Sequence, residues 1–204
     1  MPVTLALSTI DLAARAVGVV GSGCMFGTTY ATSSVIVPMI FAESTLSNSQ
    51  RLTLWNNQFD SSVSRWLPFA LAPSFIGYTI AAIRTLTLAR KGGKSGELKL
   101  PSGKVASTAR RGNRYFPGES GKVLALAAGT LFLFPIYTKL FILRSVGELK
   151  TMHQDAANAN AAGQTEKITS LIREWELKHR GRIALAALSF GLGVWDLVSL
   201  IVNA

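Results

Sequence analysis

The sequence predicts an all-α protein, a four-helix transmembrane bundle with helical extensions on the non-cytosolic side. Of the 204 residues, 49% are apolar and only 16% are charged, whereas about a quarter of the residues in a soluble domain are charged. Four apolar runs are long enough to cross a bilayer, which takes a helix of about 20 residues. The formal net charge of +10 must therefore be concentrated between these runs. We expect residues 1–204 to form a single membrane domain.

The four apolar runs predict spans at residues 16–41, 66–83, 123–143 and 183–202, each bounded by charged residues. No alternation of period two runs through them, so β-structure is not expected. The first run lacks the basic segment that opens a signal peptide, and we expect a retained span there. Glycines in the first and last spans let helices approach closely within a membrane bundle.

Residues 84–122 join the second and third spans and are strongly basic, because only Glu97 and Glu119 oppose many lysines and arginines. The positive-inside rule places this loop in the cytosol. Both termini are then also cytosolic, and residues 42–65 and 144–182 face the lumen or exterior. We expect these basic residues to set the orientation of the protein in the membrane and to contact anionic lipid headgroups. We therefore expect no nucleic-acid partner. We predict a multi-pass protein of the endoplasmic reticulum or another endomembrane.

The segment before the last span predicts two helical pieces that are separated at Gly163. Thr165 is predicted to cap the second piece, because a threonine commonly precedes the first turn of a helix. That helix continues into the last span, with Gly181 as the place where it would bend. The outer part of the protein is therefore expected to be helical.

Two charged side chains fall near the opposite, cytosolic end of the predicted bundle. Asp196 lies inside the last span and Arg15 lies just before the first. Ionisable groups inside a membrane usually pair with one another. We predict that Asp196 pairs with Arg15, close to Asp11, and that this pair is structural.

The stretch EWELKHRGR, residues 174–182, opens the last span. Trp175, His179 and Arg182 share one helical face through their spacing of four and seven residues. Taken singly, they suit an interfacial tryptophan, a structural histidine and an anchoring arginine. Taken together at the mouth of a bundle, they form a candidate site. Two acid–base pairs fall on the other faces and are predicted to support the helix, namely Glu174 with Lys178 and Glu176 with Arg180.

Further polar groups lie toward the same side of the membrane. They are Tyr30 with its neighbouring serines and threonines in the first span, and Tyr137, Thr138 and Lys139 in the third. Serine and threonine hydroxyls can instead bond to their own helix. Lys139 either extends to the membrane surface or faces the site.

The motifs exclude several classes of chemistry. Two histidines and one cysteine give no metal-ligand spacing, and no P-loop, dinucleotide-binding or G-x-S-x-G motif occurs. Acid–base chemistry on an apolar substrate remains, because a neutral imidazole accepts a proton near pH 7 and a guanidinium stabilises an enolate or phenolate oxygen. A haem held by His153 and His179 stays an alternative without spacing support.

Four segments carry a resemblance to a known family: GSGCMFGTTYATSSVIVP, LWNNQFDSSVS, FPIYTKLFIL and WELKHRGR. In this order they resemble the small four-span membrane proteins that include fungal anthrone oxygenases. The second segment departs from the family pattern, since Asn57 to Asp60 stand where an aromatic residue followed by Asp or Gly is more usual. The resemblance covers almost the whole chain apart from the basic loop. It implies oxidation of an anthrone-type polyketide to its anthraquinone with O2 and without a bound cofactor.

The resemblance also implies roles for individual residues. His179 would take a proton from the substrate, and Arg182 with Tyr137 would stabilise the oxyanion. The predicted substrate-binding residues are Trp175, Trp55, Asn57, Phe134, Thr138, Lys139 and Tyr30. The partners are then a small aromatic substrate, O2 and membrane lipid, with no metal. Two alternatives stay open, namely a non-enzymatic scaffold or carrier for lipophilic metabolites, and a redox protein that binds haem or quinone.

Overall fold

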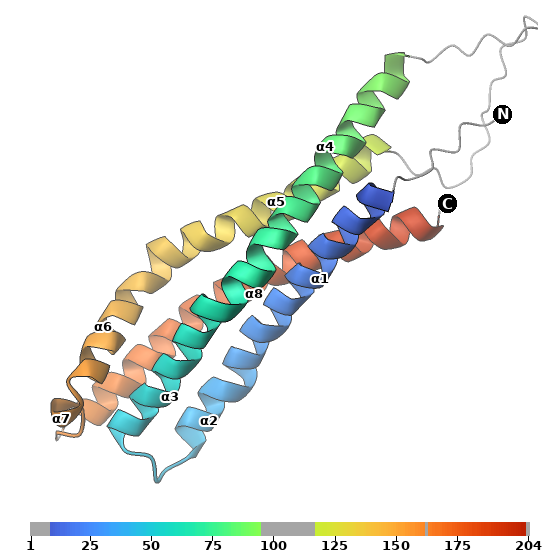
Figure 1. Cartoon of the computed structure of the whole chain (residues 1–204). Helices are drawn as coiled ribbons and strands as arrows, with labels where there is room; N and C mark the ends of the chain where they lie inside the picture. Colours follow the sequence, from blue (N-terminus) through green and yellow to red (C-terminus); the bar gives the residue numbers. More distant parts are fainter. Residues whose placement is uncertain (1–8, 95–116, 162, 203–204) are drawn as a thin grey trace, which may run out of the picture.

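The computed structural model describes residues 9–94, 117–161 and 163–202, and every regular element in these ranges is helical. Figure 1 shows long helices packed side by side along a common axis. Four helices among the described residues are long and apolar enough to cross a membrane: Thr9–Ala42, Pro68–Arg90, Glu119–Gln154 and Gln164–Val202. The predicted all-α bundle with four long apolar helices is confirmed.

Three of the four long helices change from α-helix to π-helix and back. The first comprises α1 (Thr9–Ala31), η1 (Thr32–Ile36) and α2 (Val37–Ala42), and the second comprises α3 (Asn48–Ser61), η2 (Ser62–Leu71) and α4 (Ala72–Lys94). The third comprises α5 (Pro117–Tyr137), η3 (Thr138–Ile142) and α6 (Leu143–Gln154). After the short α7 (Ala156–Ala159), α8 (Gln164–Val202) runs for 39 residues without interruption. The segments η1, η2 and η3 are the π-helical parts.

The helices extend beyond the predicted spans, which corrects two expected loops. The segment predicted as a loop over 42–65 is helical from Asn48 onward, and only residues 43–47 connect α2 to α3. Within the predicted loop 84–122, α4 continues to Lys94 and α5 begins at Pro117, while residues 95–116 lie outside the described residues. Apolar runs identify only the lipid-embedded part of a helix, because the parts in water carry polar residues on their outer faces.

A capping box starts α3. The Ser47 hydroxyl accepts the backbone N–H of Gln50, and the Gln50 side chain accepts the backbone N–H of Ser47. This reciprocal pair satisfies two donors that the first helical turn leaves free. The sequence S-N-S-Q therefore carried a helix-start signal that the apolar pattern alone did not reveal.

The predicted break before α8 is confirmed at Gly163, whose φ of 86° lies in the left-handed region that glycine adopts without strain. The helix does not begin after Thr165, the residue predicted to cap it. Because α8 starts at Gln164, Thr165 lies in the first turn, and its hydroxyl accepts the side-chain amide of Asn48 at 3.0 Å. Gly181, the predicted position of a bend, lies inside α8, and the helix continues through it.

Two apolar cores follow one another along the bundle. The span core lies between α1, α4, α5 and α8, and its buried residues include Met25, Tyr78, Leu131, Phe134 and Ala186. The extension core lies between α3, α6 and the first half of α8, and its buried residues include Trp55, Phe59, Leu149, Ile172 and Trp175. Large apolar side chains also cover the outside of the spans, among them Val20, Phe69, Phe132 and Trp195. Such an apolar exterior suits contact with lipid.

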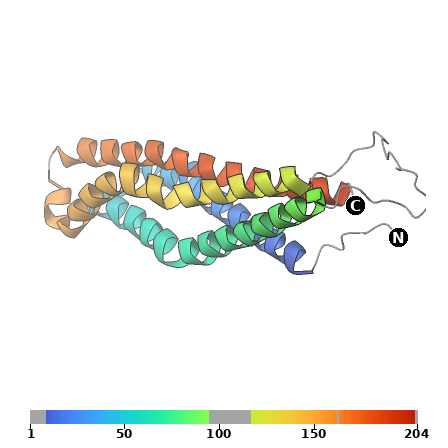
Figure 2. The same ribbon diagram turned by 90° about the horizontal axis from the view of Figure 1, so that it is seen from above.

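The length of α8 shows that part of the bundle lies outside the hydrocarbon. Its 39 residues rise about 58 Å at about 1.5 Å per residue, roughly twice the thickness of a bilayer core. Figure 2 shows the same elongated shape, with α7 at one end and the two ends of the described chain at the other. The extension core therefore forms a helical layer beyond the membrane.

One buried arginine joins all four spans at the end opposite α7. The predicted pairing of Arg15 with Asp196 is confirmed. The same guanidinium reaches Asp11 at 3.1 Å, Thr85 at 2.8 Å and Ser120 at 3.2 Å, so that it contacts α1, α4, α5 and α8. All five side chains are buried, and the Ser120 hydroxyl donates to Asp196. This network fixes the four spans relative to one another.

Candidate functional site

The predicted face of α8 is buried in the structure. Trp175, His179 and Arg182 expose only 2%, 3% and 3% of their surfaces. The two acid–base pairs of the same stretch form ion pairs along the helix, Glu174 with Lys178 at 2.5 Å and Glu176 with Arg180 at 2.8 Å. The stretch therefore divides into a charged outer side and a buried inner side, as its spacing predicted.

His179 contacts the first span through its ring. Its Nε2 lies 3.2 Å from the backbone carbonyl oxygen of Thr29. A carbonyl can only accept, so Nε2 is the donor, and in the neutral ring Nδ1 then carries the lone pair. Nδ1 is buried and has no hydrogen-bond partner among the described residues. The ring also stacks on Trp175, with centroids 4.8 Å apart and planes 20° apart. His179 therefore holds an unused basic nitrogen inside the bundle.

Arg182 lies one turn further along α8. Its guanidinium carbon is 4.6 Å from the centre of the Phe134 ring on α5, within the range of a cation–π contact. None of the ion pairs found within the described ranges involves Arg182, and its Nε has no hydrogen-bond partner there. A buried cation without an anion is costly. This position is therefore suited to an anionic group of a ligand.

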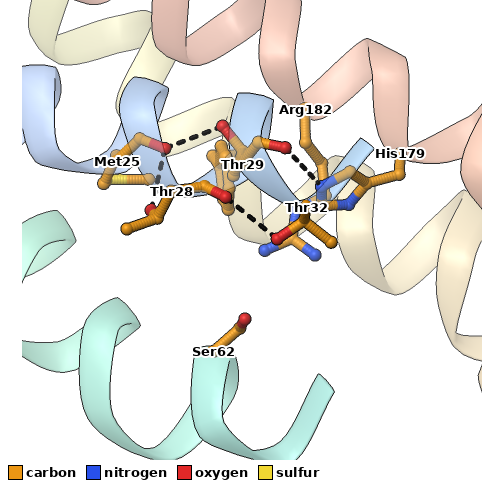
Figure 3. A pocket seen from close by; sticks show the side chains of 8 residues that line it. Met25, Thr28, Thr29, Thr32, Ser62, His179 and Arg182 are labelled. Carbon is orange, nitrogen blue, oxygen red and sulfur yellow. Dashed lines mark hydrogen bonds between the residues drawn. The ribbon is translucent and has the colours of Figure 1, made fainter. Parts of the chain in front are cut away.

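A small cavity lies beside these two side chains, and Figure 3 shows it at close range. Its lining consists of Met25, Thr28, Thr29, Thr32, Ser62, Phe134, His179 and Arg182. Ser62 faces the threonines of the first span from the opposite wall. The cavity measures about 20 Å³, which accommodates about one water-sized molecule. It lies at the junction of the span core and the extension core, and both polar and apolar side chains line it.

Two of the three π-helical segments begin at this cavity. Thr32 opens η1 and Ser62 opens η2, and both line the cavity. The third segment, η3, starts directly after Tyr137, which packs against α8 beside His179. Among the four long helices of the described residues, only α8, which carries His179 and Arg182, has no π-helical segment. Because π-helical turns are uncommon and often occur at functional sites, the start of η1 and η2 at the cavity supports this junction as the site.

Tyr137 lies next to the cavity but does not line it. Its hydroxyl donates to the backbone carbonyl of Lys178 at 3.0 Å. Its ring fills the space beside Gly181, where a Cβ atom would overlap the ring. Tyr137 therefore contacts the turn of α8 that carries the site residues.

The structure brings five of the ten predicted catalytic and binding residues together. Trp55 meets Trp175 edge-on, with centroids 5.7 Å apart and planes 88° apart. Trp175, His179, Arg182 and Phe134 thereby form one contiguous group with Trp55. The other predicted binding residues lie apart from it. Asn57, Lys139 and Tyr30 are exposed, and the Thr138 hydroxyl bonds to the Phe134 carbonyl.

Two pocket residues carried no signal of their own in the sequence. Met25 sits in an uninterrupted apolar run, and Ser62 precedes the second span in a serine-rich stretch. The helical spacing of Met25, Thr29 and Thr32 places them on one face and is the pattern from which this wall can be found. The threonines bond to their own helix, as expected, for example Thr29 to the Met25 carbonyl at 2.7 Å.

Metal-ligand chemistry gains no support from the described residues. No group of three or more His, Cys, Asp or Glu side chains within the described ranges is placed to hold an ion. His153 lies on α6 and is not part of the cavity lining.

No protein-family model, no curated protein and no solved structure matches this chain. The fold is that of a small membrane protein with four long apolar helices.

Proposed function

We propose that this multi-pass membrane protein is an enzyme that oxidises an anthrone-type polycyclic aromatic compound to its anthraquinone with O2. The observation that supports this proposal best is that His179 and Arg182 are both buried beside one cavity. Nδ1 of His179 has no hydrogen-bond partner among the described residues, and the guanidinium of Arg182 forms no ion pair there. These two side chains suit removal of a proton and stabilisation of the resulting oxyanion. The resemblance of the four sequence segments to anthrone oxygenases supplies the substrate class.

The first step is proton abstraction. An anthrone has an acidic methylene between two aryl rings, and Nδ1 of His179 takes one of its protons. The electron pair that remains delocalises onto the ring carbonyl, which becomes an enolate oxygen. Arg182 stabilises this oxygen, and a guanidinium withdrawn from water acts more strongly than one in solution. The flat rings lie against Phe134, the aromatic side chain that lines the cavity.

The second step uses O2 directly. The electron-rich anion passes one electron to O2, and the ring radical and superoxide then combine to form a carbon–oxygen bond. The resulting peroxide loses the remaining methylene proton as its O–O bond breaks. One oxygen atom stays as the new carbonyl, and the other leaves as water with the two protons. The balance is one methylene and one O2 converted to one carbonyl and one water.

The proposal requires the cavity to widen. About 20 Å³ accommodates O2 or water but not three fused rings. Met25 borders the cavity and has an unbranched, flexible side chain. Ser62 forms the facing wall at the start of η2, a ten-residue π-helix that contains Pro68. We propose that movement of this wall admits the rings.

The test compares two histidine variants. Purified protein in detergent receives an anthrone, and oxygen uptake is followed with an electrode. His179→Gln should lower the rate about 10²–10⁴-fold, the usual contribution of a general base. His153→Gln is the matched control and should keep wild-type activity, because His153 is not part of the cavity lining. Wild-type uptake by His179→Gln would remove His179 from this role.

A second candidate is a non-enzymatic carrier or scaffold for lipophilic metabolites. A separate apolar cavity of about 370 Å³ favours it, formed on the outside of the spans by α1 together with η2 and α4. Its lining residues are Ala16, Val17, Val20, Gly21, Cys24, Phe69, Ala70 and Pro73. Binding of anthrones and hydroquinones without turnover would favour the carrier.

A visible absorption band of the purified protein would instead favour the alternative of a haem-binding redox protein.

The proposed location is an endomembrane, with the termini and the basic segment in the cytosol. Support comes from the excess of lysine and arginine over residues 84–122. The cavity then lies near the opposite, lumenal face.

A further inference from the structure

We propose that Tyr137 is a positioning residue which, through Gly181, holds His179 against the Thr29 carbonyl and so makes Nδ1 the proton acceptor. The contribution to catalysis rests on the proposed function, whereas the state of the His179 ring can be measured without any reaction. Four contacts support the proposal: one from α1, two from Tyr137 on α5 and one within the third helix.

The contact from α1 sets the tautomer. The Thr29 carbonyl lies 3.2 Å from Nε2 of His179 and accepts its hydrogen. A backbone carbonyl has two lone pairs, so it can serve the helix and the histidine together. The hydrogen bond at one ring nitrogen decides which nitrogen keeps the lone pair. Nδ1 is thereby left as the base, and it has no hydrogen-bond partner within the described part of the chain.

The contact from α5 holds the other side of the same turn. Gly181 lies between His179 and Arg182 in sequence, and the ring of Tyr137 occupies the space that a side chain at position 181 would need. The Tyr137 hydroxyl donates to the Lys178 carbonyl at 3.0 Å. Phe141 in turn packs on the Tyr137 ring, with centroids 4.8 Å apart. The turn from Lys178 to Arg182 is therefore wedged between α1 and α5.

These contacts give Tyr137 a positioning role in place of the catalytic role predicted from the sequence. Its hydroxyl is already committed to the Lys178 carbonyl, and the residue is not part of the cavity lining. A change at Tyr137 or Gly181 moves the backbone of α8 and hence the His179 ring. Small displacements of a catalytic group have large effects, since a shift of about 1 Å can lower a rate about 10²-fold.

The experiment measures the ring nitrogens of His179 by NMR. The chain has two histidines, so ¹⁵N-histidine labelling of the His153→Gln protein in detergent leaves one imidazole signal set. At neutral pH we expect a protonated Nε2 and a bare Nδ1. A protonated Nδ1 in the wild-type ring, alone or together with Nε2, would overturn the proposal.

Two glycines on α8 give a matched pair of variants. Gly181→Ala places a methyl group against Tyr137, whereas Gly191→Ala points into open space on the same helix. We expect Gly181→Ala to mix the two tautomers and to lower kcat about 10²-fold with little change in KM. Gly191→Ala should match the wild type in both measurements.

Tyr137→Phe keeps the ring and removes only the hydroxyl, so it tests the proposal even if Gly181→Ala fails to fold. We expect partial mixing of the tautomers and a smaller loss of kcat. Spectra and rates equal to those of Gly191→Ala in both variants would overturn the positioning role. If the wild-type tautomer is as expected but no anthrone is turned over, the proposed function fails and the assignment of Nδ1 stands.

Discussion

Two buried arginines of the bundle have opposite surroundings. Arg15 has its guanidinium bonded to Asp11 and Asp196 and to two hydroxyls. Arg182 is equally buried and takes part in none of the ion pairs found among the described residues. A paired buried charge holds a fold in one arrangement, whereas an unpaired one destabilises it and persists where function requires it. The two residues should therefore respond in opposite ways to the same substitution.

Substitution of each arginine by methionine tests this contrast. Arg182→Met removes an uncompensated charge and keeps an apolar chain over Phe134, so it should raise the free energy of unfolding by about 1 kcal/mol or more. The same variant should lose about 10²–10³-fold in anthrone turnover. Arg15→Met removes the buried cation that pairs with Asp11 and Asp196 and should destabilise by about 3–5 kcal/mol. Thermal unfolding in detergent measures both, and equal shifts of the two variants would contradict the interpretation.

At the residue scale, helical spacing was sufficient to place Trp175, His179 and Arg182 on one buried face. The pairing of Arg15 with Asp196 also followed from the sequence, because charges inside a bilayer need partners. The sequence did not show that Arg15 also bonds to the hydroxyls of Thr85 and Ser120. Such short polar side chains occur throughout the spans, and only the packing decides which of them face a charge.

At the scale of elements, glycines set the distance between α1 and α4. A Cβ atom on Gly77 would meet the backbone carbonyl of Ala14 and the backbone of Gly18. Backbone atoms cannot rotate away as a flexible side chain can, so the two helices must separate. Close approach of this kind is how helices associate in lipid, where no water drives them together.

A matched pair of glycine variants tests this contact. Gly77→Ala should destabilise the bundle by about 1–3 kcal/mol, the usual effect of overpacking. Gly129→Ala adds the same methyl group to α5 in open space and should leave stability unchanged or slightly raised, because alanine favours a helix more than glycine does. Detergent-solubilised protein is unfolded by heat to compare them, and a Gly77→Ala midpoint at or above that of Gly129→Ala would contradict the contact.

The apolar runs were sufficient to predict the four spans. They did not predict where each helix begins and ends, nor the π-helical segments. Beyond the hydrocarbon, α3, α6 and the first half of α8 bury only a narrow apolar face, and their sequences resemble those of soluble helices. The segments η1, η2 and η3 depend on how each helix packs against its neighbours, which no local pattern in the sequence records.

For the whole molecule, the network around Arg15 shows which parts share one side of the membrane. It joins the beginnings of α1 and α5 to the ends of α4 and α8. Figure 1 shows the same four helix ends together, opposite α7. Any assignment of one of these ends to the cytosol therefore applies to all of them, and the cavity lies toward the other side.

Engineered glycosylation sites test this topology. Acceptors placed in the linker over residues 43–47 should be modified in the lumen, and acceptors within 95–116 should not, because the basic segment stays in the cytosol. Gel mobility before and after enzymatic deglycosylation measures the outcome. Modification within 95–116 alone would reverse the orientation and place the cavity toward the cytosol.

The sequence by itself determined the all-α class, the four spans and the buried face of α8. These properties depend on local composition and on the 3.6-residue period of a helix, and both are present in the order of the residues. Only the tertiary structure decided that Met25, Thr29 and Ser62 meet His179, and that Tyr137 packs on Gly181. Contacts between helices depend on their relative rotation and depth, which are set by the packing of all four helices together.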